Sequence, residues 1–192
     1  MEPQIPSRAS EGRRHVCHEG IRGFPLPKGN RDADERRFLG KHLLRKATIK
    51  DVEKVWKLVN NYADKRMMLP RSLSELYENL RDFYVVIEDG KMVGCGALHI
   101  TWEDYGEILS LAVEPGKVRQ GIGSKILKAC EEEARALGLN KLITLTYVPE
   151  FFEKHGFVRV KKSTLPHKIW SMCIKCPKFP ECDEIPLVKK IN

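Results

Sequence analysis

The chain has 192 residues and a formal net charge of +8, which suits one domain with an additional segment. No apolar run approaches the roughly 18 residues that a membrane span requires, and the N-terminus lacks the apolar core of a secretory signal. These features exclude a membrane-spanning protein and favour a cytoplasmic one. The six cysteines are therefore expected to be reduced.

The positive charge is spread over the whole chain. Residues 1–42 contain nine Lys/Arg and six Asp/Glu and so carry +3, which leaves +5 on residues 43–192. That excess favours an acidic substrate or the phosphate groups of a cofactor. No RNA- or DNA-binding motif accompanies it, so we expect no specific nucleic-acid partner.

Residues 1–42 mix Pro, Gly, Arg, Glu and His without periodicity, which predicts a disordered N-terminal extension. An Arg-rich mitochondrial transit peptide is an alternative, but the six acidic residues argue against it. A start codon assigned too far upstream would produce the same pattern. We expect one folded domain over residues 43–192.

The first predicted elements are a strand over residues 43–49 and a helix over residues 51–65. The buried stripe of this helix is expected to comprise Val52, Val55, Trp56, Val59 and Tyr62. A loop at Leu69-Pro-Arg follows. Ser72 then begins a second helix, and Glu75 completes a Ser-x-x-Glu capping box.

The middle of the chain predicts a hairpin, a further strand and a long helix. Residues 83–87 and 91–100 are strands joined at Asp89-Gly90, a strong hairpin signal, and residues 106–113 form the next strand. The helix covers residues 121–137 and ends at Gly138. Its apolar stripe is Ile122, Ile126, Ala129, Cys130, Ala134 and Leu137.

The rest of the chain predicts a strand over residues 141–147, a short helix over 149–155 and strands over 157–161 and 185–191. Cys95 and Cys130 lie in apolar contexts and are expected to be small core residues. Strands mixed with helices and hairpins predict an α/β fold with a mostly antiparallel sheet.

The most informative segment is residues 117–125, Lys-Val-Arg-Gln-Gly-Ile-Gly-Ser-Lys, between a strand and a helix. The first N–H groups of a helix have no partner within it, and the helix dipole favours negative charge there. Gly121 and Gly123 would let a phosphate approach the backbone. The loop is neither a Walker A nor a Gly-x-Gly-x-x-Gly sequence, so it indicates another diphosphate ligand, or else an ordinary glycine turn.

This loop resembles the Arg/Gln-x-x-Gly-x-Gly/Ala signature of the GNAT acetyltransferases, with Val118 at the first signature position. The order of three further segments is also similar: Glu107-Ile-Leu-Ser-Leu-Ala-Val113, Leu145-Thr-Tyr-Val-Pro-Glu-Phe-Phe-Glu-Lys-His-Gly-Phe157 and Leu165-Pro-His-Lys-Ile-Trp170. With Leu69-Pro-Arg-Ser72, they look like stand-alone amino-acid N-acetyltransferases of the N-acetylglutamate synthase type. The resemblance covers about residues 43–191.

The resemblance implies the GNAT fold and acetyl-CoA as co-substrate. In the family, the pyrophosphate binds the signature loop and the strand before it polarises the thioester carbonyl. The implied cofactor-binding residues are Leu111, Ala112, Val113, Arg119, Gln120, Gly121, Ile122, Gly123 and Ser124.

Acetyl transfer to an amine needs a base for the ammonium and an acid for the leaving thiolate. Glu107 lies two, four and six residues before Leu109, Leu111 and Val113, so alternation predicts one shared face. An acid among apolar neighbours has a raised pKa, which suits a base, and Glu107 matches the glutamate of histone-type members of the family. Phe152 occupies the family's tyrosine position and has no proton to give. Tyr147 is the predicted replacement acid.

The substrate of the resembling enzymes would bring carboxylates, which arginine binds best. Arg71 lies in the segment that resembles their substrate loop, and Ser72 and Lys168 are secondary candidates. Those enzymes often carry Arg where this chain has Leu109. A more apolar amino acid therefore remains open as the substrate.

A cysteine cluster follows the substrate-like segment. Cys173-x-x-Cys176 has metal-ligand spacing, and Cys182 and His167 would complete a structural Zn site. A reduced, packed cluster and a disulfide are the alternatives.

These patterns together predict an acetyl-CoA-dependent N-acetyltransferase, with L-glutamate as the leading substrate and arginine biosynthesis as its setting. Another small amine, a protein N-terminus or lysine, and a polyamine stay open as acceptors, as does a non-catalytic acyl-CoA-binding module. The sequence leaves both a monomer and a homodimer open.

Overall fold

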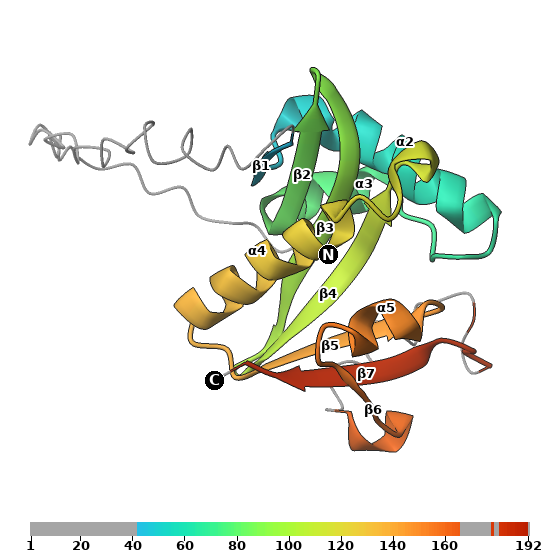
Figure 1. The fold of residues 1–192 in the computed structure, drawn as a ribbon. Helices are drawn as coiled ribbons and strands as arrows, with labels where there is room; N and C mark the ends of the chain where they lie inside the picture. The colour runs from blue at the N-terminus through green and yellow to red at the C-terminus, as the bar shows by residue number, and fades with distance from the viewer. Residues whose placement is uncertain (1–41, 166–177, 179–180, 192) are drawn as a thin grey trace, which may run out of the picture.

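The computed structural model describes residues 42–165, 178 and 181–191, around a seven-stranded sheet of order β1-β2-β3-β4-β5-β7-β6 (Figure 1). Strands β4 and β5 run parallel, and all other neighbours in the sheet are antiparallel. This confirms the mostly antiparallel α/β sheet. The strands are β1 (Leu43–Lys46), β2 (Phe83–Glu88), β3 (Lys91–Trp102), β4 (Tyr105–Val113), β5 (Lys141–Thr146), β6 (Val158–Arg159) and β7 (Ile185–Lys190).

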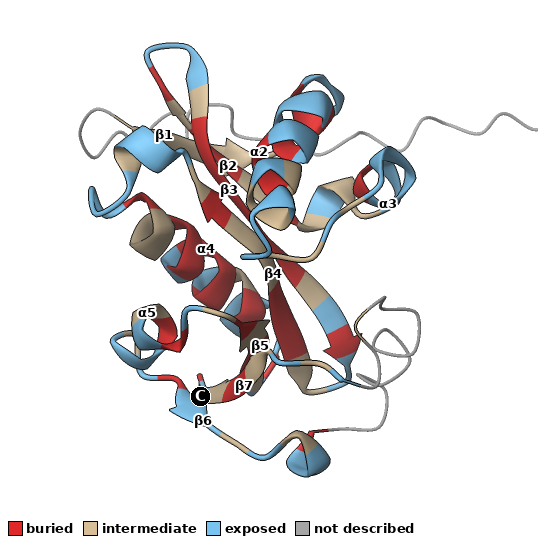
Figure 2. Cartoon of the chain, turned by 90° about the vertical axis from the view of Figure 1, so that its right-hand side faces the viewer, coloured by how far each residue is buried: buried red, intermediate tan, exposed pale blue. Residues whose placement is uncertain are grey.

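Helices cover both faces of this sheet. Helices α2 (Val52–Asp64) and α3 (Leu73–Glu78) pack on one face, and α4 (Ile122–Ala136) packs on the other. Figure 2 shows the buried residues of α2 and α4 turned toward the strands between them. The short helix α5 (Pro149–Glu153) lies beside β6 and β7. None of the helices in the described ranges is long and apolar enough to cross a membrane.

Four local signals in the sequence are confirmed. Ser72 accepts a hydrogen bond from the Glu75 amide, and Glu75 accepts one from the Ser72 amide, which completes the capping box. Asp89 and Gly90 both have positive φ, as a tight hairpin turn requires. Gly138, the residue after the C-cap of α4, has φ +79°, and Cys95 and Cys130 are fully buried.

Three expectations, one about the end of a strand and two about the buried faces of helices, are wrong. The first strand ends at Lys46 because Asp51 accepts hydrogen bonds from the Thr48 amide and from Arg45, which turns the chain. Trp56 is 37% exposed, and Leu58 instead belongs to the buried stripe of α2. Leu137 is 53% exposed because α4 has already ended and the chain turns away from the core.

A β-bulge in β4 overturns a further expectation, that Glu107, Leu109, Leu111 and Val113 share one face. Ala97 pairs with Leu109, but Cys95 pairs with Ala112, and Ser110 has φ +52°. The extra residue reverses the alternation. Leu109 therefore packs with the α2 side of the core, whereas Leu111 and Val113 pack with the α4 side.

Strands β4 and β5 pair over only three residues of each, Tyr105–Glu107 with Lys141–Ile143. The next link between them is a side-chain hydrogen bond, which Thr144 Oγ1 donates to the Ile108 carbonyl (3.2 Å). Figure 1 shows the two strands diverging beyond this point. The C-terminal half of β4 thus faces an opening in the sheet.

Two glycines of β3 bring α4 close to the sheet. A Cβ at Gly94 would lie 2.7 Å from Ile122 Cγ2, and one at Gly96 would lie 2.7 Å from Ile126 Cγ2. The absence of side chains here sets the position of α4, whose N-terminus borders the opening.

Gly96→Ala is expected to lower the free energy of unfolding by about 1–3 kcal/mol, because the added methyl overpacks the interface with α4. Gly116→Ala is the matched control, since a Cβ at Gly116 meets open space. Urea unfolding of both variants measures the difference. Equal stabilities would contradict the close packing of α4.

Candidate functional site

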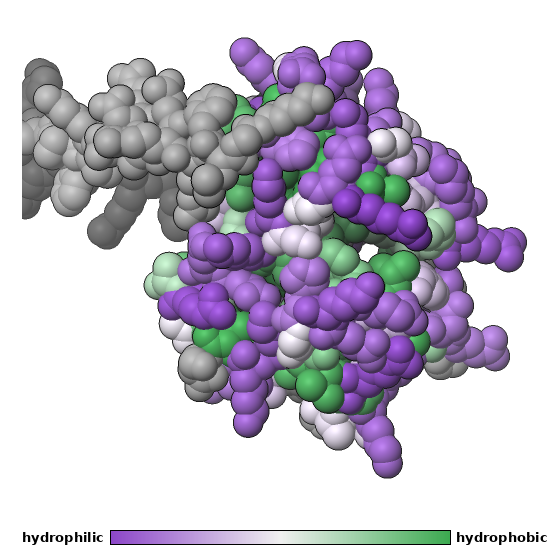
Figure 3. All heavy atoms as spheres, viewed as in Figure 1, coloured by the Kyte–Doolittle hydropathy of each residue, from purple (hydrophilic) through white to green (hydrophobic). Residues whose placement is uncertain are grey.

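The opening between β4 and β5 continues into a cavity of about 1290 Å³ that reaches both faces of the sheet. On the face shown in Figure 3, charged and polar residues cover most of the surface, and a hollow edged by apolar residues opens between them. Residues from α3, β3, β4, β5 and the N-terminus of α4 line the cavity. It is large enough for a cofactor and a small substrate together.

The N-terminus of α4 borders one end of the cavity. Gly121 caps the helix with φ +79°, and a Cβ there would meet open space. The cavity lining includes Arg119, Gly121, Ile122, Gly123 and Ser124. The first N–H groups of the helix therefore face an opening that can hold an anion. Of the loop residues expected to bind a cofactor, Gln120 is exposed and lies outside the lining.

Ser124 is held in place by a histidine from α5's C-terminal turn. The ring of His155 bonds the Phe151 carbonyl through Nδ1 (2.8 Å) and Ser124 Oγ through Nε2 (2.9 Å). Because a carbonyl only accepts, Nδ1 carries the proton, and in the neutral ring Ser124 donates to Nε2. Leu111, Ala112 and Val113 of β4 line the same region of the cavity.

Glu107 lies where β4 parts from β5, with a relative exposure of 5%. Its Oε2 atom is fully buried and has no hydrogen-bond partner among the residues that the structure describes. Burial raises the pKa of this carboxyl to about 7, against the opposing effects of His99 and Arg71. A carboxyl group that titrates near neutral pH and lines a cavity can accept a proton.

A histidine and a carboxylate stand beside Glu107. His99 is the direct partner of Glu107 across the β3–β4 pairing, and its Nδ1 bonds Asp82 Oδ2 (2.7 Å). The hydrogen bond to Asp82 raises the pKa of His99, which favours the imidazolium form. Both residues line the cavity.

Arg71 lines the cavity from the loop before α3. Asn60 of α2 donates to the Arg71 carbonyl (2.9 Å) and accepts from its amide (3.2 Å), which ties the loop to the helix. The Arg71 side chain is 18% exposed and lies 3.8 Å from Glu75. Ser72, a second substrate candidate, is exposed and lies outside the lining because its hydroxyl is used in the capping box.

Tyr147 lines the opposite wall of the cavity, after β5. Its hydroxyl donates to Asp183 Oδ1 (2.7 Å), and Lys178 contacts both groups. Burial, the largest cause, raises the pKa of Tyr147 to about 12. The phenol is therefore protonated at neutral pH, with its proton directed at Asp183. Phe152, in contrast, is buried in the core against Phe157.

The predicted Zn site falls mostly outside the described residues, which include Cys182 but not His167, Cys173 or Cys176. Within the described ranges no group of three His, Cys, Asp or Glu side chains is placed to hold a metal ion. The Zn site stays a prediction. Lys168 also lies outside the described residues.

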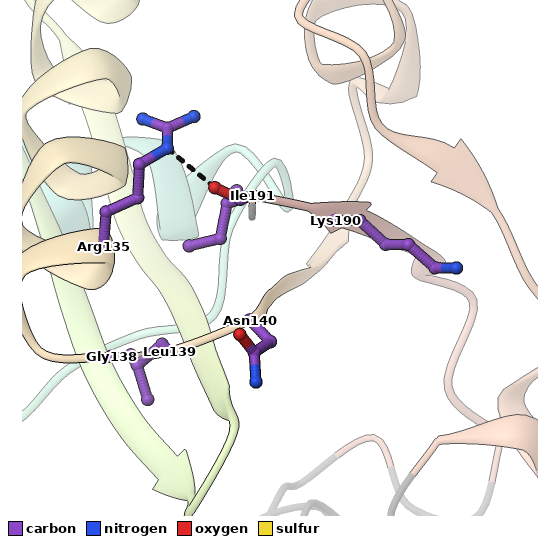
Figure 4. Close-up of a pocket in the computed structure, with 6 residues that line it drawn as sticks. All are labelled: Arg135, Gly138, Leu139, Asn140, Lys190 and Ile191. Carbon is purple, nitrogen blue, oxygen red and sulfur yellow. Dashed lines mark hydrogen bonds between the residues drawn. The ribbon is translucent and has the colours of Figure 1, made fainter.

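A smaller hollow of about 440 Å³ lies where the end of α4 meets the end of β7 (Figure 4). Arg135 Nε donates to the Ile191 carbonyl (2.7 Å), and the Ile191 amide donates to the Asn140 carbonyl (3.0 Å). Lys190 extends away from Arg135 in Figure 4. These two hydrogen bonds fasten the end of β7 to α4 and to the segment before β5.

Sequence reasoning missed His99, Asp82 and Glu184, which all line the cavity. Counting outward from the turn at Glu103 and Asp104 would pair His99 with Ile108. A register shift between Ile100 and Trp102 pairs it with Glu107 instead, so the hairpin signal alone does not identify this pair. Asp82 and Glu184 approach from distant segments, which no local pattern brings together.

The splayed sheet, the glycine-bordered helix N-terminus and the buried glutamate define the class of protein. Residues 49–157 match the acetyltransferase (GNAT) family model, so the chain belongs to the GNAT family of acetyltransferases. The fold, with its mixed sheet flanked by helices, is the GNAT fold.

Several relatives carry amino-acid acetyltransferase names. An amino-acid acetyltransferase of Mycobacterium tuberculosis is 38% identical over 68% of this chain and 77% of its own length. An uncharacterized N-acetyltransferase of Chlorobaculum tepidum is 34% identical over 77% of this chain and 96% of its own. An amino-acid acetyltransferase of Ralstonia nicotianae is 36% identical, but the match spans only 28% of its length.

Two solved structures share the fold. Rv2747 of Mycobacterium tuberculosis, in complex with CoA and NLQ, has a TM-score of 0.68 and 32% identity over 78% of this chain and 99% of its own. N-acetylglutamate synthase of Neisseria gonorrhoeae, complexed with coenzyme A and N-acetyl-glutamate, has a TM-score of 0.71 and 25% identity. That match covers 80% of this chain and 36% of the synthase.

Replacement of Glu107 is expected to stabilise the protein at alkaline pH. The folded-state pKa of about 7 exceeds the ordinary value of about 4.3 in the unfolded chain, so the folded state holds a proton that the unfolded state has lost. Stability therefore falls as pH rises from about 4 to 7. Glu107→Gln removes this loss, with a relative gain on the order of a few kcal/mol at pH 8 and less at pH 5.

Urea unfolding between pH 5 and pH 8 measures this difference, with Glu103→Gln, in the exposed β3–β4 turn, as the control. A difference between Glu107→Gln and the parent that is the same at every pH would show that the burial of Glu107 does not alter its titration.

Proposed function

We propose that the protein transfers the acetyl group of acetyl-CoA to the α-amine of an amino acid, with L-glutamate as the leading substrate. The observation that carries the proposal is Glu107, a buried carboxyl group at the parting of β4 and β5 with an oxygen that lacks a partner among the described residues. The amino-acid acetyltransferase names of the relatives support the substrate class. Formation of N-acetyl-L-glutamate would place the enzyme in arginine biosynthesis, in the cytoplasm.

Acetyl-CoA would bind along the opening between β4 and β5. Its pyrophosphate would accept hydrogen bonds from the N–H groups of residues 119–124 at the start of α4, and the helix dipole would favour its charge. Its thioester would lie against Leu111, Ala112 and Val113, where β4 has no backbone partner in β5. The open space beside Gly121 supports this fit.

Glu107 would act as the general base. The substrate amine is an ammonium ion at neutral pH, and Glu107 takes its proton directly or through one water molecule. The neutral amine nitrogen then attacks the acetyl carbonyl carbon. The Arg71 guanidinium would hold the α-carboxylate, which fixes the amine near Glu107, and the tether from Asn60 supports this by positioning the loop. Ser72 and Lys168 stay secondary candidates.

Tyr147 would supply the proton for the thiolate as the carbon–sulfur bond breaks. Its raised pKa of about 12 supports an acid that is protonated at working pH. The hydroxyl must turn from Asp183 toward the sulfur for this step. Lys178, which contacts both groups, would keep Asp183 paired after the turn.

The position of Leu109 supports a second kind of acceptor, a neutral amino acid. Leu109 packs on the same side of β4 as Glu107 and lines the cavity, so it offers apolar contact to the substrate side chain. A neutral amino acid such as glutamine or leucine would be favoured by this residue, whereas the net charge of +5 on residues 43–192 favours glutamate.

Gly121→Asp is expected to raise the dissociation constant of acetyl-CoA at least tenfold, about 1.4 kcal/mol, because it adds a negative charge at the proposed phosphate site. Gly121→Asn is the matched control, since Asn and Asp have nearly the same shape and both are enriched among non-glycine residues at positive φ, the conformation of Gly121. Calorimetric titration with acetyl-CoA measures both. Equal affinities of the two variants for acetyl-CoA would show that the pyrophosphate does not bind at this loop.

Release of CoA thiol in the presence of each of the twenty amino acids and of polyamines tests the function. Glutamate should react fastest, and Arg71→Ala should raise its KM by roughly tenfold or more while acetyl-CoA affinity stays unchanged. Arg81→Ala, at an exposed arginine outside the cavity lining, is the control. Faster reaction with polyamines than with any amino acid would overturn the proposal, and binding of acetyl-CoA without turnover would indicate a regulatory module.

A further inference from the structure

The interaction between His99 and Glu107 carries an inference that rests on the proposed role of Glu107 as the base. The burial of Glu107 and its proposed role as the base favour opposite protonation states. Its burial favours the protonated carboxylic acid, yet a base must have lost its proton before the substrate arrives. Some neighbouring positive charge must therefore offset the burial.

The charged groups that face Glu107 come from three elements. His99 approaches from β3, Arg71 from the loop before α3, and Glu184 from the segment before β7. The two cations favour the carboxylate, and Glu184 opposes it. Glu184 is itself partly buried, and this burial raises its pKa.

The two cations differ once substrate is bound. Arg71 would be paired with the substrate α-carboxylate, so its effect on Glu107 is largely cancelled in the complex. His99 is also paired with a carboxylate, Asp82, through Nδ1, but Asp82 lies on the side away from β4, so the imidazolium is the nearer charge to Glu107. His99 accordingly favours the Glu107 carboxylate with the Asp82 pair in place. It keeps its position across from Glu107, with side chains of such strand partners ~5 Å apart at Cβ.

We infer that His99, held by Asp82, is a positioning residue that keeps Glu107 ionised near neutral pH and thereby ready to accept the proton of the amine. The Asp82 carboxylate fixes the orientation of the ring and stabilises its positive charge. The hydrogen bond to Asp82 raises the pKa of His99, against the effect of burial, in the direction this role needs. Removal of the charge leaves Glu107 with Arg71 alone, so the pKa of Glu107 rises.

The pH profile of kcat/KM for the amino acid, with acetyl-CoA saturating, tests this inference. His99→Gln should move the acidic limb upward by about one pH unit, because an opposite charge at this range shifts a carboxyl pKa by one unit or more. Activity at pH 6 should then fall about tenfold relative to the parent, with less than threefold change at pH 9. Asp82→Asn should shift the limb in the same direction by a smaller amount.

His99→Lys and Lys141→Gln serve as controls. His99→Lys keeps a positive charge and should restore the limb of the parent. Lys141→Gln removes a cation paired with Asp104 outside the cavity and should leave the profile unchanged. If the acidic limb of the His99→Gln profile lies at the same pH as that of the parent, the positive charge of His99 has no such role. An equal shift of this limb in His99→Lys and His99→Gln would overturn the inference as well.

A titration without substrates separates this inference from the proposed function. The ¹³C resonance of the Glu107 carboxyl group is assigned as the one absent from Glu107→Gln, and its pKa is read from the shift with pH. A higher pKa in His99→Gln than in the parent supports the inference even if no amine is acetylated, and equal pKa values overturn it. Full activity of Glu107→Gln would instead refute the base assignment alone.

Discussion

Strands β4 and β5 run side by side over three residue pairs and then separate, and the rest of the site depends on that short pairing. Beyond Glu107, the backbone of β4 has a strand partner only on its β3 side among the residues that the structure describes. Unpaired backbone groups in a sheet interior are costly unless another group binds them. The opening therefore offers hydrogen-bond partners to an extended ligand. Helix α4 begins at its border, because Gly94 and Gly96 let the first turns of the helix pack closely on the sheet.

The separation of β4 and β5 also places a carboxyl group in a buried position, where ionisation is unfavourable. Glu107 is the last β4 residue paired with β5. Its side chain is buried and also lines the cavity. The β-bulge at Ser110 then turns Leu111 and Val113 to the other face. As a result, the proposed base and two of the proposed thioester contacts, Leu111 and Val113, lie on opposite sides of the sheet beside the same opening.

The sequence predicted most of the elements, since periodicity, the capping box at Ser72 and the Asp89-Gly90 turn are local signals. The strand alternation failed at β4 because a single left-handed residue, Ser110, reverses the face of every later side chain. The sequence could predict the apolar neighbours of Glu107 but not the charged residues around it. Its apolar neighbours are close in sequence, but Asp82 and Glu184 reach the cavity only through the tertiary fold.

Amide hydrogen–deuterium exchange with and without acetyl-CoA tests most directly whether the opening between β4 and β5 is the acetyl-CoA site. We expect slower exchange at residues 109–113 and 121–124 when acetyl-CoA is bound, and no change in the β2–β3 turn at Asp89 and Gly90. Unchanged exchange at residues 109–113 and 121–124, with protection confined to the hollow between Arg135 and Ile191, would contradict this account.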